Sequence, residues 1–153
     1  MQYWLLKSEP NAYSIDDLKN DKSTEWGGVR NYQARNTLRD SMEKGDLAFF
    51  YHSSTDEPAI VGICEIASEA IADTSALDKK DSHHDPKSSL ANPIWYARTV
   101  KFKKKFKSPI TLTKLREMKD LDKMVLLQRG SRLSVQPVSE AEWNVIEKHL
   151  EKQ

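Results

Sequence analysis

The sequence WGGVRNYQARN, residues 26–36, contains the features on which the fold and the function of this chain depend. An indole at Trp26 precedes the pair Gly27–Gly28, which interrupts regular structure, and a cluster of polar side chains follows directly. A flat, hydrogen-bonding ring is bound by aromatic faces for stacking and by donors and acceptors for its edge. The stretch is therefore a candidate pocket for such a ring. Core packing of the aromatic residues, with polar neighbours turned outward, explains the same pattern.

A helix is expected to begin within this stretch and to run from Asn31 to Met42. Ala34, Leu38 and Met42 recur at helical spacing and would form one buried stripe. Gly45 is placed to end the helix, because glycine readily adopts the left-handed conformation found behind helix C-termini.

Strands are expected on both sides of this helix. Tyr3–Lys7 is a short aromatic and aliphatic run, and Leu47–His52 and Ala59–Ala67 are apolar runs that a polar segment separates. Ile94–Phe106 reads as a long strand in which alternating lysines share one solvent face. Between the last two runs, Thr74–Pro93 is polar and forms the longest loop, a kind of segment that is often functional.

Two further helices carry their own start signals. Ser14 with Asp17, and Ser139 with Glu142, have the spacing of a capping box. A short helix is also expected over Thr111–Met118. The buried stripe of the last helix would consist of Trp143, Ile146 and Leu150. These elements predict the α+β class.

Length and composition predict one globular, water-soluble domain over residues 1–153, with 38% hydrophobic and 31% charged residues. No apolar run approaches the roughly 18 residues of a membrane helix, and the N-terminus does not resemble a signal peptide. Cys64 is the only cysteine, which excludes an internal disulfide and predicts a cytoplasmic location. A net charge of +1 argues against a protein that coats duplex nucleic acid, and a monomer is expected.

Catalytic and metal motifs are missing from the sequence. There is no G-x-S-x-G elbow and no glycine-rich phosphate loop, and Cys64 lies within an apolar strand, as a buried structural thiol does. Residues 83–85, His-His-Asp, are adjacent in sequence, so their side chains diverge and do not form a metal site. We therefore expect no catalytic residue, no metal and no cofactor. Two alternatives remain open: a small hydrolase or base-modifying enzyme that uses His52 with Ser53 or Glu9, and a protein-interaction subunit.

Several sequence blocks resemble the EVE domain family, in family order and over nearly the whole chain. They are YWLLKSEP (3–10), WGGVRNYQARN (26–36), GDLAFFYHS (45–53), IVG (60–62), DPKS (85–88) and GSRLSVQPV (130–138). The resemblance implies a PUA-like fold, in which a strongly bent mixed sheet closes into a pseudo-barrel surrounded by short helices. It also implies a non-catalytic reader that holds a modified base, notably a modified cytosine of DNA or RNA, in an aromatic-walled pocket.

Transferred onto this chain, the resemblance implies a set of pocket residues. Trp26 and Tyr32 would be stacking walls, with Tyr51 and Trp4 as weaker candidates. Asn31 and Gln33 would read a base edge, because amides offer both a donor and an acceptor. The remaining candidates lie at strand ends or supply hydroxyl and guanidinium groups for sugar or phosphate: Lys7, Ser8, Glu9, Arg30, His52, Ser53, Ser131, Arg132, Leu133 and Ser134.

Some of these residues have an equally plausible structural role. Arg30 and Arg132 can pair with carboxylates, and Glu9 can serve as such a partner. One departure from the family pattern concerns the loop before Asp85. Family members often carry aromatic residues there, whereas this chain has His83 and His84, which leaves an aromatic contribution from the loop open.

Overall fold

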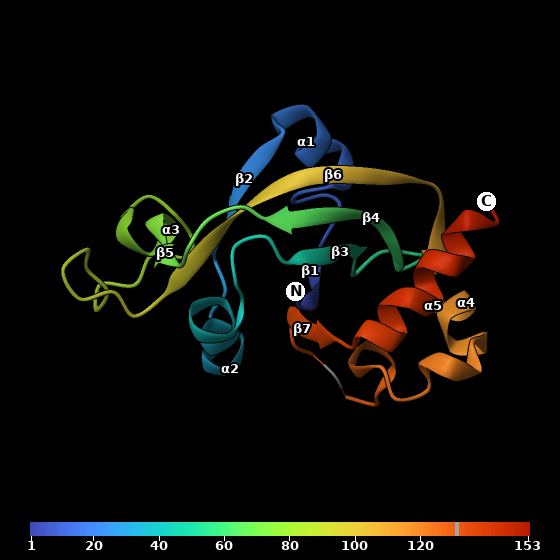
Figure 1. The fold of residues 1–153 in the computed structure, drawn as a ribbon. Helices are drawn as coiled ribbons and strands as arrows, with labels where there is room; N and C mark the ends of the chain where they lie inside the picture. Colours follow the sequence, from blue (N-terminus) through green and yellow to red (C-terminus); the bar gives the residue numbers. More distant parts are fainter. Residues whose placement is uncertain (131) are drawn as a thin grey trace.

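One mixed sheet forms the centre of the fold and bends around the molecule (Figure 1). This computed structural model describes residues 1–130 and 132–153. The strands lie in the order β2-β6-β4-β3-β1-β7, and β5 pairs with β6. The β1–β3 pair is parallel and the others are antiparallel. The strands are β1 (Tyr3–Ser8), β2 (Ser23–Trp26), β3 (Leu47–His52), β4 (Ala59–Ile66), β5 (Ile71–Ala72), β6 (Tyr96–Thr111) and β7 (Val135–Val138).

Within the described residues, five α-helices surround the sheet. Both helix starts predicted from Ser14 with Asp17 and from Ser139 with Glu142 are present, and each has a capping box. The predicted helix from Asn31 to Met42 is divided: α2 continues directly into a π-helical turn over residues 37–41. Its predicted stripe is buried as expected. The helices are α1 (Ile15–Asp21), α2 (Tyr32–Asn36), α3 (Thr74–Leu77), α4 (Leu112–Glu117) and α5 (Glu140–Glu151).

The predicted strands are confirmed. One end is shifted by a single residue in β1 and in β4, and both ends are shifted further in β6. The strand expected over residues 94–106 begins at Tyr96 and continues to Thr111, where it runs directly into α4. Its alternating lysines are exposed, and two of them pair with acids: Lys103 with Glu65 at 3.4 Å and Lys105 with Asp16 at 2.7 Å. The strand β2 was not predicted, because four residues are too few to establish an alternating pattern.

The central strands place alternate side chains in two separate cores. Leu5 of β1 and Phe49 of β3 pack with Trp143 of α5, whereas Leu6 and Phe50 pack with the cluster that contains Trp26. We call the first the helix-covered face and the second the pocket face. On the helix-covered face, the Trp143 ring stacks on Phe49 at a centroid distance of 3.9 Å and on Tyr3 at 4.4 Å.

The sheet is open along one seam, contrary to the expectation that it closes into a pseudo-barrel. Its two end strands are β2 and β7, and no pairing joins them within residues 1–130 and 132–153. The α+β class and the bent mixed sheet are confirmed. In the same described part of the chain, no helix is both long enough and apolar enough to cross a membrane.

Candidate functional site

A pocket of about 620 Å³ lies at this seam. Its walls come from the end of β1, from β2 and the turn behind it, from the loop around His83, and from Ser134 just before β7. The strand ends that do not pair with each other thus leave a hollow between them. The predicted site residues that line it are Lys7, Ser8, Glu9, Trp26, Arg30, Asn31 and Ser134.

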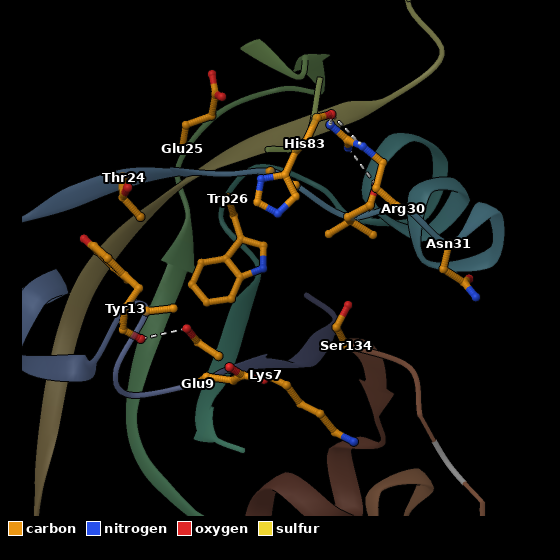
Figure 2. Close-up of a pocket in the computed structure, with 15 residues that line it drawn as sticks. Lys7, Glu9, Tyr13, Thr24, Glu25, Trp26, Arg30, Asn31, His83 and Ser134 are labelled. Carbon is orange, nitrogen blue, oxygen red and sulfur yellow. Dashed lines mark hydrogen bonds between the residues drawn. The ribbon is translucent and has the colours of Figure 1, made fainter. Parts of the chain in front are cut away.

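The indole of Trp26 forms the centre of the pocket wall (Figure 2). The residue is 8% exposed, and its ring meets Phe50 edge to face at a centroid distance of 5.5 Å. Figure 2 shows the imidazole of His83 and the phenol of Tyr13 around the same hollow. Among the residues that the structure describes, none accepts a hydrogen bond from Trp26 Nε1, so this donor is available to a ligand.

The two glycines after Trp26 are required for different reasons, Gly27 by the close approach of Asp73 and Gly28 by its backbone conformation. A Cβ atom at Gly27 would lie 2.6 Å from Asp73 Oδ1, so no larger residue fits without movement of that carboxylate. Gly28 has φ +72°, a conformation that glycine adopts without steric cost, and its N–H donates to Asp73 Oδ2 at 2.7 Å. The turn can therefore place the backbone directly against the pocket.

The buried Asp73 carboxylate anchors one whole side of the pocket. Its side chain is 0% exposed and pairs with Arg30 Nη1 at 2.8 Å, and Ser75 donates to it from N–H and hydroxyl. Burial opposes ionisation, but the hydrogen bonds from Arg30, Ser75 and Gly28 outweigh it and lower the pKa of Asp73. Arg30 also donates to the carbonyl of His83, which ties the loop to the pocket rim. The structural role left open for Arg30 is thus the one observed.

The opposite side of the pocket is formed by the end of β1. Ser8 Oγ donates to the Tyr13 carbonyl at 2.7 Å and so holds the turn behind the strand. Lys7 is half-buried, and burial lowers the pKa of its amine. Its ammonium lies 6.0 Å from the ring centroid of Tyr51, and Figure 2 shows it directed away from Trp26. Within the described residues, neither Lys7 nor the exposed Glu9 forms an ion pair.

Two residues predicted to meet the ligand directly adopt other positions. Asn31 lines the pocket, but its side-chain oxygen accepts from Ala34 N–H at 3.0 Å as the N-cap of α2, and Figure 2 shows the side chain turned away from Trp26. Tyr32 lies outside the pocket and stacks on Trp95 at 5.0 Å. Gln33 follows it on the exposed side of α2.

The remaining candidates are not brought to the pocket. Trp4 and Tyr51 are buried in the two cores, and Trp4 Nε1 donates to Asp46 at 3.0 Å. Ser53 donates its backbone N–H to the Ser8 carbonyl. Arg132 and Leu133 precede β7 without lining the pocket, and the predicted residue Ser131 lies outside the described residues.

His52 has a structural partner. Its Nε2 accepts a hydrogen bond from the backbone N–H of Ile15 at 3.1 Å, which joins the end of β3 to the first turn of α1. Burial lowers the pKa of His52, in keeping with the neutral ring that this bond requires. Cys64 is buried as predicted, and burial raises the pKa of its thiol to about 12. Neither residue lines the pocket.

Reasoning from sequence missed two apolar side chains of the described pocket lining, Ala12 and Val29, and four polar or aromatic ones, Tyr13, Thr24, Glu25 and His83. Thr24 and Glu25 belong to β2, a strand that was not predicted. Tyr13 was overlooked because it directly precedes the Ser14 helix cap. The signal for His83 was its place just before the Asp85–Lys87 block, where the family often has an aromatic residue. Its imidazole takes part in the pocket wall, so the loop does contribute a ring.

The arrangement is suited to holding a flat polar ring. It offers aromatic walls, a free indole N–H and several unpaired polar groups in a volume within the roughly 300–1,000 Å³ range of ligand pockets. Among the described residues, no three His, Cys, Asp or Glu side chains gather as metal ligands.

Known proteins resemble this chain along nearly its whole length. Thymocyte nuclear protein 1 of Gallus gallus is 41% identical to it, over 94% of this chain and 66% of that protein, so the chain spans about two thirds of this relative. A hypothetical protein from Leishmania major has a solved structure that is 44% identical, with a TM-score of 0.94 over 100% of this chain and 96% of the other.

A second solved structure is of human thymocyte nuclear protein 1 (THYN1) in complex with DNA that contains 5-methylcytosine. It is 39% identical, with a TM-score of 0.89 over 100% of this chain and 99% of the other. The sequence profile of the EVE domain matches residues 2–149 of the present chain. The chain therefore belongs to the EVE domain family.

Proposed function

We propose that this chain is a nucleic-acid reader that holds one modified base, foremost a modified cytosine, in the seam pocket without chemically changing it. The observation that carries the proposal is Trp26: a largely buried indole that forms a pocket wall while its N–H has no partner among the described residues. A base stacked there would find a rigid aromatic surface and a free donor. Base–aromatic stacking contributes about 1–3 kcal/mol per base.

The base edge would be read by the polar groups around the indole. Ser134 and Ser8 offer hydroxyl oxygens, and Glu9 offers a carboxylate without an ion-pair partner in the described chain. A cytosine presents both an amino donor and ring acceptors, so such a mixed set matches it. Discrimination would follow when a wrong base leaves one of these groups unpaired, which costs about 1–3 kcal/mol for each.

The relative bound to DNA supports the choice of base. Human thymocyte nuclear protein 1 has been crystallised with 5-methylcytosine-containing DNA, and its fold matches this chain over its entire length. That the pocket residues predicted from the sequence, above all Trp26, contact the base is our proposal for this chain.

The test is the affinity for a fluorescently labelled oligonucleotide with one 5-methylcytosine, compared with the same strand containing cytosine. Trp26→Ala should weaken binding of the methylated strand by roughly 10- to 100-fold, the range expected from lost stacking. Trp143→Phe is the matched control, because it alters a tryptophan on the helix-covered face and should leave affinity unchanged. A folded Trp26→Ala protein with wild-type affinity would contradict the proposed function.

The hydrolase alternative lacks support at the residue on which it rested. His52 Nε2 accepts a hydrogen bond from the Ile15 N–H, and the residue does not line the pocket, where a substrate would lie. A non-catalytic module is accordingly part of the proposal. Turnover of any nucleotide that disappears in His52→Ala would overturn it.

We further propose that the chain acts in the cytoplasm, on the basis of its single, buried and unpaired thiol. The word nuclear in the name of its relatives points to a second compartment. Cell fractionation of the tagged chain distinguishes the two.

A further inference from the structure

Four side chains form a continuous column from the pocket wall to the outer surface. The Arg30 guanidinium, which lines the pocket, lies 5.1 Å from the ring centroid of Trp95. Tyr32 stacks on Trp95 with an interplanar angle of 22°, and the Arg35 guanidinium lies 4.8 Å from the Tyr32 centroid. Two stacked aromatic rings with an arginine at each end thus connect the pocket with the exposed side of α2.

The inner half of this column is rigidly held. Trp95 is buried, and its Nε1 donates to Asp85 at 2.7 Å, while Arg30 is fixed by Asp73. Tyr32 therefore rests on a ring that cannot easily turn. Because the supporting Trp95 ring is already fixed, stacking of a ligand on Tyr32 would cost the protein little conformational entropy.

The outer half of the column combines an exposed ring with a half-buried arginine that forms no salt bridge among the described residues. Tyr32 is 60% exposed, an unusual position for a large aromatic ring in a protein that buries its other tyrosines and tryptophans in larger part. Arg35 donates only to neutral oxygens, those of Ile94 and Asn36. Among the described residues it has no carboxylate partner, whereas Arg39 on the next turn is paired with Asp40 at 2.8 Å.

We propose that Tyr32 and Arg35 form a platform for the nucleotide next to the base held in the pocket. The neighbouring base would take the place of the Arg35 guanidinium over the Tyr32 ring, and the displaced Arg35 would contact the phosphate. The inference rests on the proposed function and extends it from a base to a strand. An exposed aromatic ring beside an unpaired arginine is the combination with which proteins bind single-stranded nucleic acid. Arg30, shared by the pocket and the column, makes the two surfaces continuous.

The proposal predicts different responses to a nucleoside and to a strand. Two probes are titrated: the free nucleoside 5-methyl-2′-deoxycytidine, and a short single-stranded oligodeoxynucleotide with one central 5-methylcytosine. Tyr32→Ala should weaken binding of the oligonucleotide by roughly 5- to 100-fold and leave nucleoside affinity unchanged. Tyr32→Phe, which keeps the ring, should bind the strand as the wild type does.

The two proposals fail in distinguishable ways. If Tyr32→Ala binds the strand with wild-type affinity, the platform is wrong while the pocket stands. If Tyr32→Ala weakens nucleoside and strand equally, Tyr32 acts only by shaping the pocket, and the platform is again wrong. If Trp26→Ala binds both probes normally, the proposed function itself fails.

Arg35→Gln gives a second readout that does not depend on stacking. The slope of log affinity against log salt should fall by roughly 0.7 for one lost phosphate contact on a single strand. Arg39→Gln is the matched control, because that arginine is already paired with Asp40, and its slope should match the wild type. Equal slopes for wild type and Arg35→Gln would overturn the phosphate contact.

Discussion

The two faces of the sheet are built from the same strands, but one is covered by a long helix and the other borders a pocket. On the helix-covered face, Trp143 is sandwiched between Phe49 and Tyr3, and the long helix α5 lies across it (Figure 1). On the pocket face, Trp26 has one aromatic partner among the described residues, an edge-to-face contact with Phe50, and it borders a hollow. The same residue type thus serves as a core element on one face and as a wall open to a ligand on the other.

The difference shows what makes a binding pocket out of a core. The pocket face is covered by short elements, α1 and α2, and by a glycine turn, which together leave the seam between the end strands unfilled. Around this seam, the hydrogen bond from Gly28 and the ion pair with Arg30 hold the turn to Asp73, where the other face uses apolar packing. The comparison therefore predicts that stability depends mainly on one face and binding mainly on the other.

Removing the central ring of the helix-covered face should have the largest effect. Trp143→Ala deletes both stacking contacts of a fully buried side chain, and such substitutions cost about 3–5 kcal/mol of unfolding free energy. Denaturant unfolding measures this loss. Affinity for the methylated strand, expressed per folded molecule, should stay at the wild-type value. If affinity falls as far as in Trp26→Ala, the two faces are not independent.

The polar anchor of the pocket face should matter next. Asp73→Asn replaces one acceptor oxygen with a donor that confronts either Gly28 N–H and Arg30 or Ser75 N–H, and an unsatisfied buried group costs about 1–3 kcal/mol. The folded-state pKa of Asp73 is lowered, so its contribution is present above the unfolded value near 3.8 and is lost as pH falls through the lower folded value.

Unfolding midpoints of wild type and Asp73→Asn are to be compared at pH 7 and in steps below pH 4. The gap between the two proteins should shrink in the acid range, because wild-type Asp73 then becomes protonated. A gap that stays constant down to the lowest pH would show that the charge of Asp73 is not what holds the turn. Ser75→Ala, which removes only the hydroxyl donor, should give a smaller loss.

His52 should give the smallest effect, visible as a pH dependence on the pocket face. The pKa of His52 in the folded state lies below its ordinary value of 6.5, so the folded state binds fewer protons than the unfolded one. Stability is therefore greatest above pH 6.5 and declines as pH falls towards the folded value. Asp16 opposes this shift and Lys105 adds to it.

His52→Gln keeps an acceptor for Ile15 N–H but does not titrate. Thermal melts of the variant should be flatter between pH 7 and pH 5 than those of the wild type. Identical pH profiles for the two proteins would remove His52 as the source of the slope.

The sequence predicted the local features well and the three-dimensional site less completely. Capping boxes and apolar runs depend on neighbouring residues, so Ser14, Ser139 and the strands around Cys64 were identified correctly. Trp26 was found because its flanking glycines and polar residues are contiguous. The length of β6 was underestimated, because Lys107, Ser108 and Pro109 interrupt the apolar pattern, whereas Ile110 and Thr111 beyond them still pair with β4.

Side-chain direction was the part that sequence could not supply. Tyr51 and His52 are adjacent, and alternation in β3 sends Tyr51 into the helix-covered core. Tyr32 follows the cap residue Asn31, and the path of α2 turns its ring towards Trp95, which is distant in sequence. The role of Asp73 had no local signal at all, since it depends on a close approach across 45 residues to Gly28.

An open sheet also has two bare strand edges, which are templates for unwanted pairing with other molecules. Both are blunted here: β2 and β7 have only four residues each. Pro137 strengthens the protection of β7. Lys7 N–H donates to the Ser134 carbonyl, so by ladder alternation Trp4 and Pro137 form a pair without hydrogen bonds. The proline position therefore presents no N–H to the outside. The sheet can therefore stay open around a ligand pocket while its edge strands offer few backbone groups for pairing with a β-strand of another molecule.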